Sequence, residues 1–82
     1  MIPKIKMIQP QKDYTLLITF DSGEQVIYDV KDDIRQLPDF SVLQTEYNLF
    51  NNVQIDESRT CIFWNDRVDL PSDTLFEYGR KI

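Results

Sequence analysis

Acidic side chains are the groups in this chain whose type and spacing could do chemistry. Asp29, Asp32 and Asp33 lie close together after a predicted strand, and carboxylate oxygens are the ligands that Ca²⁺ and Mg²⁺ take. Asp66 and Asp69 form a second group, and a pair of carboxylates can hydrolyse a substrate when a cleft fixes them apart. The first group lacks the central glycine and terminal glutamate of an EF-hand loop, and nothing fixes the second across a cleft. Solvated or helix-capping roles are the simpler interpretation.

The other common catalytic groups are missing. The chain has no histidine, which removes the usual general base and the Ser-His and Cys-His nucleophile pairs. Its one cysteine, Cys61, lies in a predicted strand, where we interpret it as a small core hydrophobe. Gly23 and Gly79 are isolated, so no phosphate-binding glycine loop can form. We therefore predict no catalytic residue, no metal and no cofactor.

The charges are distributed unevenly along the chain. Nine basic and fourteen acidic residues give a net charge of -5. Residues 1–12 contain three lysines and no acid, whereas residues 13–77 contain all fourteen acids and only four bases. A domain with this charge does not attract nucleic acid, so we expect no direct nucleic-acid binding. Two interpretations remain: an acidic face offered to a basic protein partner, or a solvated surface that keeps a small protein soluble.

Size and apolar content set the class of protein. An 82-residue chain predicts one domain covering residues 1–82. A single cysteine cannot form an intramolecular disulfide, which favours a reducing compartment. The sequence has neither the apolar run of a signal peptide nor an apolar stretch near the ~20 residues of a membrane helix. We expect a cytoplasmic protein that does not bind membranes; oligomeric state stays open.

Residues 13–30 have the clearest secondary-structure pattern in the chain. Apolar and polar residues alternate along 13–20 and again along 25–30, which predicts two half-buried strands. Asp21-Ser22-Gly23 between them suits a turn that ends in a left-handed glycine. The resulting register pairs Ile18 with Val26, Leu16 with Tyr28 and Tyr14 with Val30, all on one face.

Further elements follow along the chain. Residues 3–8 predict an edge strand bracketed by Pro3 and Pro10. Residues 53–55 and 62–64 predict a second hairpin with its loop at 56–59, and residues 68–70 a short extended piece. The asparagine-rich segment 48–52 predicts a turn with Phe50 packed inward.

Two helices are predicted. Phe40, Leu43 and Tyr47 have the spacing of one helical stripe, with Asp39 as the N-cap. Residues 71–78 predict a second helix that ends at Gly79 in the left-handed conformation. The fold class is therefore α+β: a small, mostly antiparallel sheet in the order β-β-β-α-β-β-α, with its two short helices on one face.

Exposed aromatic and charged residues are the candidates for recognition. Tyrosine and tryptophan dominate interface hot spots, although a small core also uses its large residues for packing. We expect Phe20, Phe40, Phe50 and Trp64 to be core residues. The candidate interaction surface consists of Tyr47, Asp66, Arg67, Asp69 and Tyr78.

Three segments together resemble a known family. They are residues 13–24, a strand with its turn glycine and acidic residue; Tyr28-Asp29-Val30; and residues 62–77, a pattern of Trp, Asn, Asp-Leu, Pro and Leu-Phe. In this order they resemble the bacterial domain-of-unknown-function family DUF2442. Arg67 stands where that family commonly has glycine, and Phe76 where it commonly has tyrosine.

The resemblance implies a small α+β fold with no assigned activity or catalytic residues. It also implies a short cytoplasmic protein of bacteria or phages. Some members carry a helix-turn-helix domain after this module, which we do not expect here because the chain stops at Ile82. Others are encoded beside a second small family in arrangements that look like toxin–antitoxin pairs.

Three functions are consistent with these observations. The favoured one is a non-enzymatic protein-interaction or regulatory module, with the acidic half of a toxin–antitoxin-like pair as its specific form. The partner would be a basic protein. The alternatives are an accessory domain of a DNA-associated transcription regulator, and a carboxylate- or metal-dependent enzyme.

Overall fold

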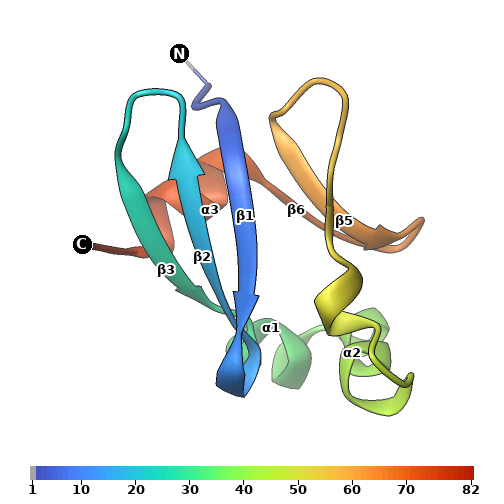
Figure 1. The fold of residues 1–82 in the computed structure, drawn as a ribbon. Helices are drawn as coiled ribbons and strands as arrows, with labels where there is room; N and C mark the ends of the chain where they lie inside the picture. Colours follow the sequence, from blue (N-terminus) through green and yellow to red (C-terminus); the bar gives the residue numbers. More distant parts are fainter. Residues whose placement is uncertain (1) are drawn as a thin grey trace.

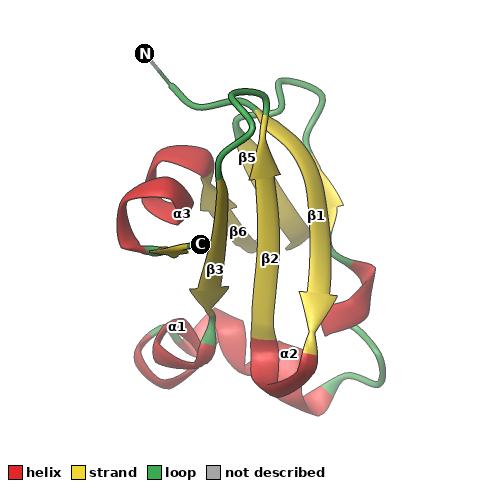
Figure 2. Cartoon of the chain, turned by 60° about the vertical axis from the view of Figure 1, so that its left-hand side comes forward, coloured by secondary structure: helices red, strands yellow, loops and turns green. Residues whose placement is uncertain are grey.

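The computed structural model describes residues 2–82, which form two antiparallel sheets and three short helices (Figures 1 and 2). The first sheet has the strand order β1-β2-β3-β7, formed by β1 (Ile5–Gln11), β2 (Thr15–Phe20), β3 (Gln25–Asp29) and β7 (Arg80–Lys81). The second has the order β4-β5-β6, formed by β4 (Gln54–Ile55), β5 (Cys61–Asn65) and β6 (Val68–Pro71). The predicted α+β class and antiparallel pairing are confirmed. The strands of residues 2–82 form two sheets, however, and not the one small sheet predicted, and there are three helices where two were predicted.

The helices connect and flank these sheets. They are α1 (Lys31–Gln36), α2 (Val42–Thr45) and α3 (Ser72–Tyr78), with single 3-10 turns η1 (Lys12–Tyr14), η2 (Pro38–Ser41) and η3 (Phe50–Asn52). Figure 1 shows α1 and α2 at one end of the sheets, beside the connection from β1 to β2. None of the helices in residues 2–82 is long and apolar enough to cross a membrane.

The hairpin of β2 and β3 has the predicted register. Ile18 pairs with Val26 and Leu16 with Tyr28, and the backbone N–H of Val30 donates to the Tyr14 carbonyl at 2.9 Å. Gly23 has φ +92°, the left-handed conformation that the turn requires. β1 lies at the edge of its sheet as predicted, but it runs on through Pro10 to Gln11. An edge strand tolerates proline because one side of its backbone needs no partner.

The predicted helix across Phe40, Leu43 and Tyr47 is wrong. Two short pieces, η2 and α2, bury Phe40 and Leu43, and the chain is extended again at Glu46. It then turns through Asn48, at φ 59°, so that Phe50 reaches the core and Tyr47 is left 98% exposed. Burial of a large aromatic side chain outweighs the weak preference of a short stripe for helix.

Two local details of that region also differ from prediction. Asp39 is not an N-cap: the cap position is Leu37, and Asp39 lies within the first turn of η2 with no capping hydrogen bond. Helix α1, which the sequence pattern did not predict, begins directly after β3 and buries Ile34.

Gly79 is extended rather than left-handed, with φ -71° and ψ 152°. This corrects the prediction of a left-handed cap, although α3 does end there. The chain passes so close to Val26 at this point that a side chain on residue 79 has no room. It continues into β7, which pairs with β3.

The core draws on both sheets, and Trp64 lies where they meet the helical end. Its indole N–H donates to the Phe50 carbonyl at 3.0 Å, and its ring stacks on Phe50 at 5.9 Å and contacts Phe40 edge-on at 6.2 Å. At the other end, the Ile5 N–H donates to the Arg59 carbonyl at 2.8 Å, which links β1 to the second hairpin.

Tyr28 makes the stability of the fold decrease at alkaline pH. Its hydroxyl donates to Asp33 Oδ2 at 2.7 Å, and burial, followed by that bond and the Asp33 charge, raises the pKa of Tyr28 well above its ordinary value. The folded state then keeps a proton that the unfolded chain releases above pH ~10, so stability falls as pH rises beyond that value. Tyr28→Phe should cost about 1 kcal/mol at pH 7 and should remove this alkaline loss.

The measurement is urea unfolding at pH 7 and between pH 10 and 11. Tyr78→Phe is the matched control, because Tyr78 is exposed. An alkaline loss that is equally large in Tyr28→Phe would show that other groups cause it.

Candidate functional site

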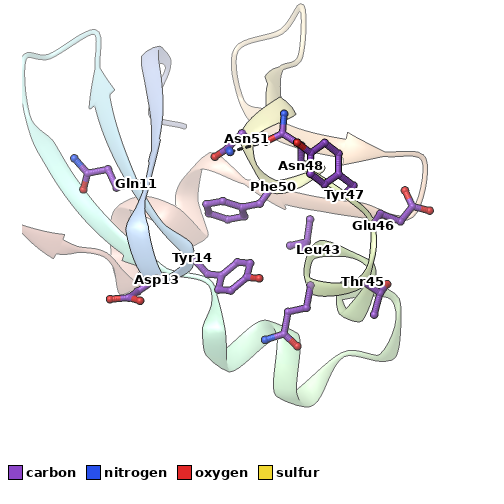
Figure 3. A pocket seen from close by; sticks show the side chains of 11 residues that line it. Gln11, Asp13, Tyr14, Leu43, Thr45, Glu46, Tyr47, Asn48, Phe50 and Asn51 are labelled. Atoms are coloured by element: carbon purple, nitrogen blue, oxygen red, sulfur yellow. Dashed lines mark hydrogen bonds between the residues drawn. The ribbon is translucent and has the colours of Figure 1, made fainter.

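A pocket of about 640 Å³ opens between the β1–β2 connection and the segment from α2 to η3 (Figure 3). We call it the Tyr47 pocket, after its most exposed side chain. Its lining residues are Gln11, Asp13, Tyr14, Leu43, Gln44, Thr45, Glu46, Tyr47, Asn48, Phe50 and Asn51. The two sides of the pocket thus come from segments about thirty residues apart in sequence, brought together because Tyr14 and Phe50 pack on each other.

Aromatic rings form the inner wall of the Tyr47 pocket. Tyr14 and Phe50 meet edge to face with ring centroids 5.2 Å apart, and Figure 3 shows the two side chains reaching toward each other from opposite sides. Phe50 is buried and stacked on Trp64, so its position is fixed by the core. Tyr14 is only half-buried. Phe50 is therefore the rigid part of the wall, and Tyr14 is the part that solvent or a ligand can reach.

The backbone around the pocket is strained. Asp13, Tyr14 and Asn48 have φ values of 60°, 57° and 59°. Asparagine and aspartate adopt this left-handed conformation readily, but an aromatic residue such as Tyr14 does so at a cost of roughly 1–2 kcal/mol. Such strain persists only where surrounding contacts enforce it, and it clusters at functional sites.

Specific hydrogen bonds enforce these conformations. The Lys31 ammonium donates to the Asp13 carbonyl at 2.7 Å, and the Val30 N–H holds the Tyr14 carbonyl. Across the pocket, the side-chain amide of Asn51 donates to Asn48 Oδ1 at 2.8 Å, the bond drawn in Figure 3. Both sides are therefore preorganised, which lowers the entropy cost of binding a ligand.

The rim is acidic and hydrogen-bonding. Asp13 and Glu46 line the pocket, no lysine or arginine does, and neither acid forms an ion pair within residues 2–82. The Tyr47 side chain stands at the rim almost completely in solvent. An exposed tyrosine beside an aromatic wall and two carboxylates can hold a cationic or hydrogen-bond-donating group of a partner.

The predicted surface residues lie in three separate regions. Tyr47 is in the pocket; Asp66 and Arg67 form the turn between β5 and β6, and Asp69 is on β6; Tyr78 ends α3. Figure 1 places the β5–β6 turn and the end of α3 on opposite sides of the molecule. The structure therefore does not gather the five into one patch. Sequence reasoning missed Tyr14 and Phe50 as pocket residues because both have the pattern of inward-facing core positions.

Each carboxylate of the Asp29–Asp33 group has its own partner. Asp29 lies 3.2 Å from the Lys31 ammonium, Asp32 bonds Arg35, and Asp33 accepts from Tyr28. Within residues 2–82, no three metal-binding side chains converge. Asp66 and Asp69 are exposed on the β5–β6 hairpin, where Asn65 Oδ1 accepts the turn N–H groups.

Cys61 is half-buried on β5. Burial raises the pKa of its thiol, and the negative charges of Asp69 and Asp56 raise it further. A protonated thiol is a poor nucleophile. The prediction of a core position is wrong, however, because the side chain is only half-buried and lies outside the core cluster.

Comparison with known proteins gives one match. The family described as "Protein of unknown function (DUF2442)" matches residues 5–81, nearly the whole chain. No curated protein and no solved structure matches it. The match includes both sheets and every residue that lines the Tyr47 pocket. The chain therefore belongs to DUF2442, a family of proteins of unknown function.

Proposed function

We propose that this protein is a non-enzymatic interaction module that binds a protein partner at the Tyr47 pocket. The observation that carries the proposal is an almost fully exposed Tyr47 beside a pocket in whose wall Tyr14 is held in a strained backbone conformation. A strained backbone residue such as Tyr14 is the kind of feature that clusters at functional sites, and exposed tyrosines are common at interface hot spots.

The pocket's charge supports a basic partner. Asp13 and Glu46 lie on the rim, and the chain's net charge of -5 gives an overall field that attracts cationic surfaces. A lysine or arginine side chain of the partner could lie against Tyr14 and place its charge beside one of the two carboxylates. In its specific form, the proposal is that this protein is the acidic member of a two-protein, toxin–antitoxin-like pair in the cytoplasm.

The test is site-specific photocrosslinking in cells of the source organism. A photoreactive phenylalanine analogue replaces Tyr47 in one variant and Tyr78, equally suited because it is also exposed, in a matched control. We expect one discrete protein to be captured at position 47 and not at position 78.

Two further measurements make the result decisive. The captured protein is purified and titrated with the unmodified chain, and Tyr47→Ala should weaken binding by at least about tenfold, as for an interface hot spot. Capture at position 78 only, or equal affinity for Tyr47→Ala, would contradict the proposal.

A further inference from the structure

A second groove lies at the opposite end of β2 from the Tyr47 pocket. It has a volume of about 790 Å³ and is formed by the N-terminal residues 2–4, the β2–β3 turn, α3 and β7. We call it the Phe76 groove. Figure 1 shows the β2–β3 turn and the N-terminus together at one end of the sheet, and α1 and α2 at the other. The two sites cannot share one small ligand.

The base of the Phe76 groove is apolar. The rings of Phe20 and Phe76 meet edge to face at 5.2 Å, and Phe20 is buried while Phe76 is half-buried. Ile2 is 56% exposed where it lines the groove. Because water contacts both Phe76 and Ile2, a partner that covers them would bury apolar surface, which favours binding.

The rim of the groove carries unpaired negative charge. Glu24, Asp73 and Glu77 line it, and none of them forms an ion pair within residues 2–82. The fourth lining acid, Asp21, is already paired with Arg59 at 2.9 Å.

The two lysines of the groove do not neutralise these acids. The Lys4 ammonium donates to the Ser58 carbonyl at 3.4 Å, and the Lys81 ammonium donates to the Phe76 carbonyl at 3.3 Å. Lys81 also lies 4.1 Å from the centroid of the Phe76 ring. Lys81 therefore already lies over one face of the Phe76 ring, and a partner's apolar side chains would contact the part of the ring that stays exposed.

We propose that the Phe76 groove binds a short basic, amphipathic segment of a protein partner. Apolar side chains of the segment cover Phe76 and Ile2, and its lysines or arginines pair with Glu24, Asp73 and Glu77. This site is independent of the Tyr47 pocket, so the module offers two acidic contact sites at opposite ends of one sheet. Two linked contacts strengthen binding far beyond either one alone.

The probe is a short synthetic peptide of alternating lysine and leucine, titrated calorimetrically into the full chain. A lysine–serine peptide of equal length and charge is its control. Glu24→Gln with Glu77→Gln removes two rim charges; both residues are exposed, so the fold should be unaffected. Asp73 is left in place because it lies in the first turn of α3, where an acid stabilises the helix. Asp39→Asn with Glu57→Gln makes the same change in net charge elsewhere.

We expect the lysine–leucine peptide to bind and the lysine–serine peptide to bind much more weakly. The groove pair should weaken binding by roughly fivefold or more, and the control pair by less than about twofold. Ile2→Ser should also weaken binding, whereas Tyr47→Ala should not.

Four outcomes would overturn the proposal. The first is that the lysine–leucine peptide does not bind, and the second is that the lysine–serine peptide binds equally well. The third is that the two pairs of variants weaken binding equally, which would show that only net charge matters. The fourth is that Tyr47→Ala alone abolishes binding, which would place the peptide at the Tyr47 pocket. The last outcome leaves the Tyr47 pocket standing, and the first three do not bear on it.

Discussion

Trp64→Ala is expected to destabilise the protein by about 3–5 kcal/mol, because it removes a buried ring and leaves a cavity. Trp64 is 6% exposed, and it packs on Phe40 and Phe50 where the second sheet meets the helical end. A chain of this size has only a few kcal/mol of stability to lose, so the variant should be largely unfolded at 37 °C. Urea unfolding followed by circular dichroism measures the change without needing the tryptophan signal.

Trp64→Phe separates the ring from its hydrogen bond. Phenylalanine keeps most of the packing but cannot donate to the Phe50 carbonyl, which Trp64 contacts at 3.0 Å. Leaving that buried carbonyl unpaired should cost about 1–3 kcal/mol. If Trp64→Phe were as destabilising as Trp64→Ala, packing would not be the main contribution of this residue, and the account of the core would be wrong.

Gly79→Ala is expected to destabilise the protein by about 1–3 kcal/mol or more, through overpacking rather than strain in φ. A Cβ at residue 79 would lie 2.5 Å from the Leu75 carbonyl oxygen and 2.8 Å from Val26 Cβ. Neither atom can move without shifting the end of α3 or the start of β3. Relief of the clash should detach β7, which pairs with β3 directly beyond the glycine.

Gly23→Ala is the matched control, because the two glycines are needed for different reasons. No atom lies within 4 Å of a Cβ at Gly23, but its φ of +92° is unfavourable for alanine. That change should cost about 1 kcal/mol. Chemical denaturation of both variants measures which of them loses more free energy of unfolding. A larger loss at Gly23 than at Gly79 would contradict the close approach of α3 to β3.

Local signals predicted the parts of the fold whose causes are local. The hairpin of β2 and β3 follows from two-residue alternation and a turn that needs a left-handed glycine, and both are visible in a short window. The loop at 56–59 and the extended residues 68–70 were predicted for similar reasons. Helix α3 was predicted from its proline start and glycine end.

The failures have tertiary causes. Phe40, Leu43 and Tyr47 have helical spacing, but the chain leaves the helix so that Phe50 can stack on Trp64. That contact joins residues 14 positions apart, and no local pattern encodes it. Gly79 was placed correctly at a helix end but for the wrong reason, since its neighbour Val26 is distant in sequence.

The candidate site was predicted in part. Tyr47 was selected because an exposed tyrosine is a common recognition residue, and the structure places it beside the pocket. Tyr14 was interpreted as an inward-facing strand residue, and its left-handed backbone has no signature in the sequence. Asp66, Arg67, Asp69 and Tyr78 were grouped with Tyr47 by residue type, and only the three-dimensional structure separates them.

The most direct test of the account is where a bound partner touches the chain. Hydrogen exchange of backbone amides is measured for the protein alone and with the partner captured at position 47. We predict protection at residues 11–14 and 43–51, the two segments that line the Tyr47 pocket, with residues 66–69 unchanged. Protection at the β5–β6 turn with none around Tyr47, or turnover of a small molecule by the chain, would show that the protein does not act through this pocket.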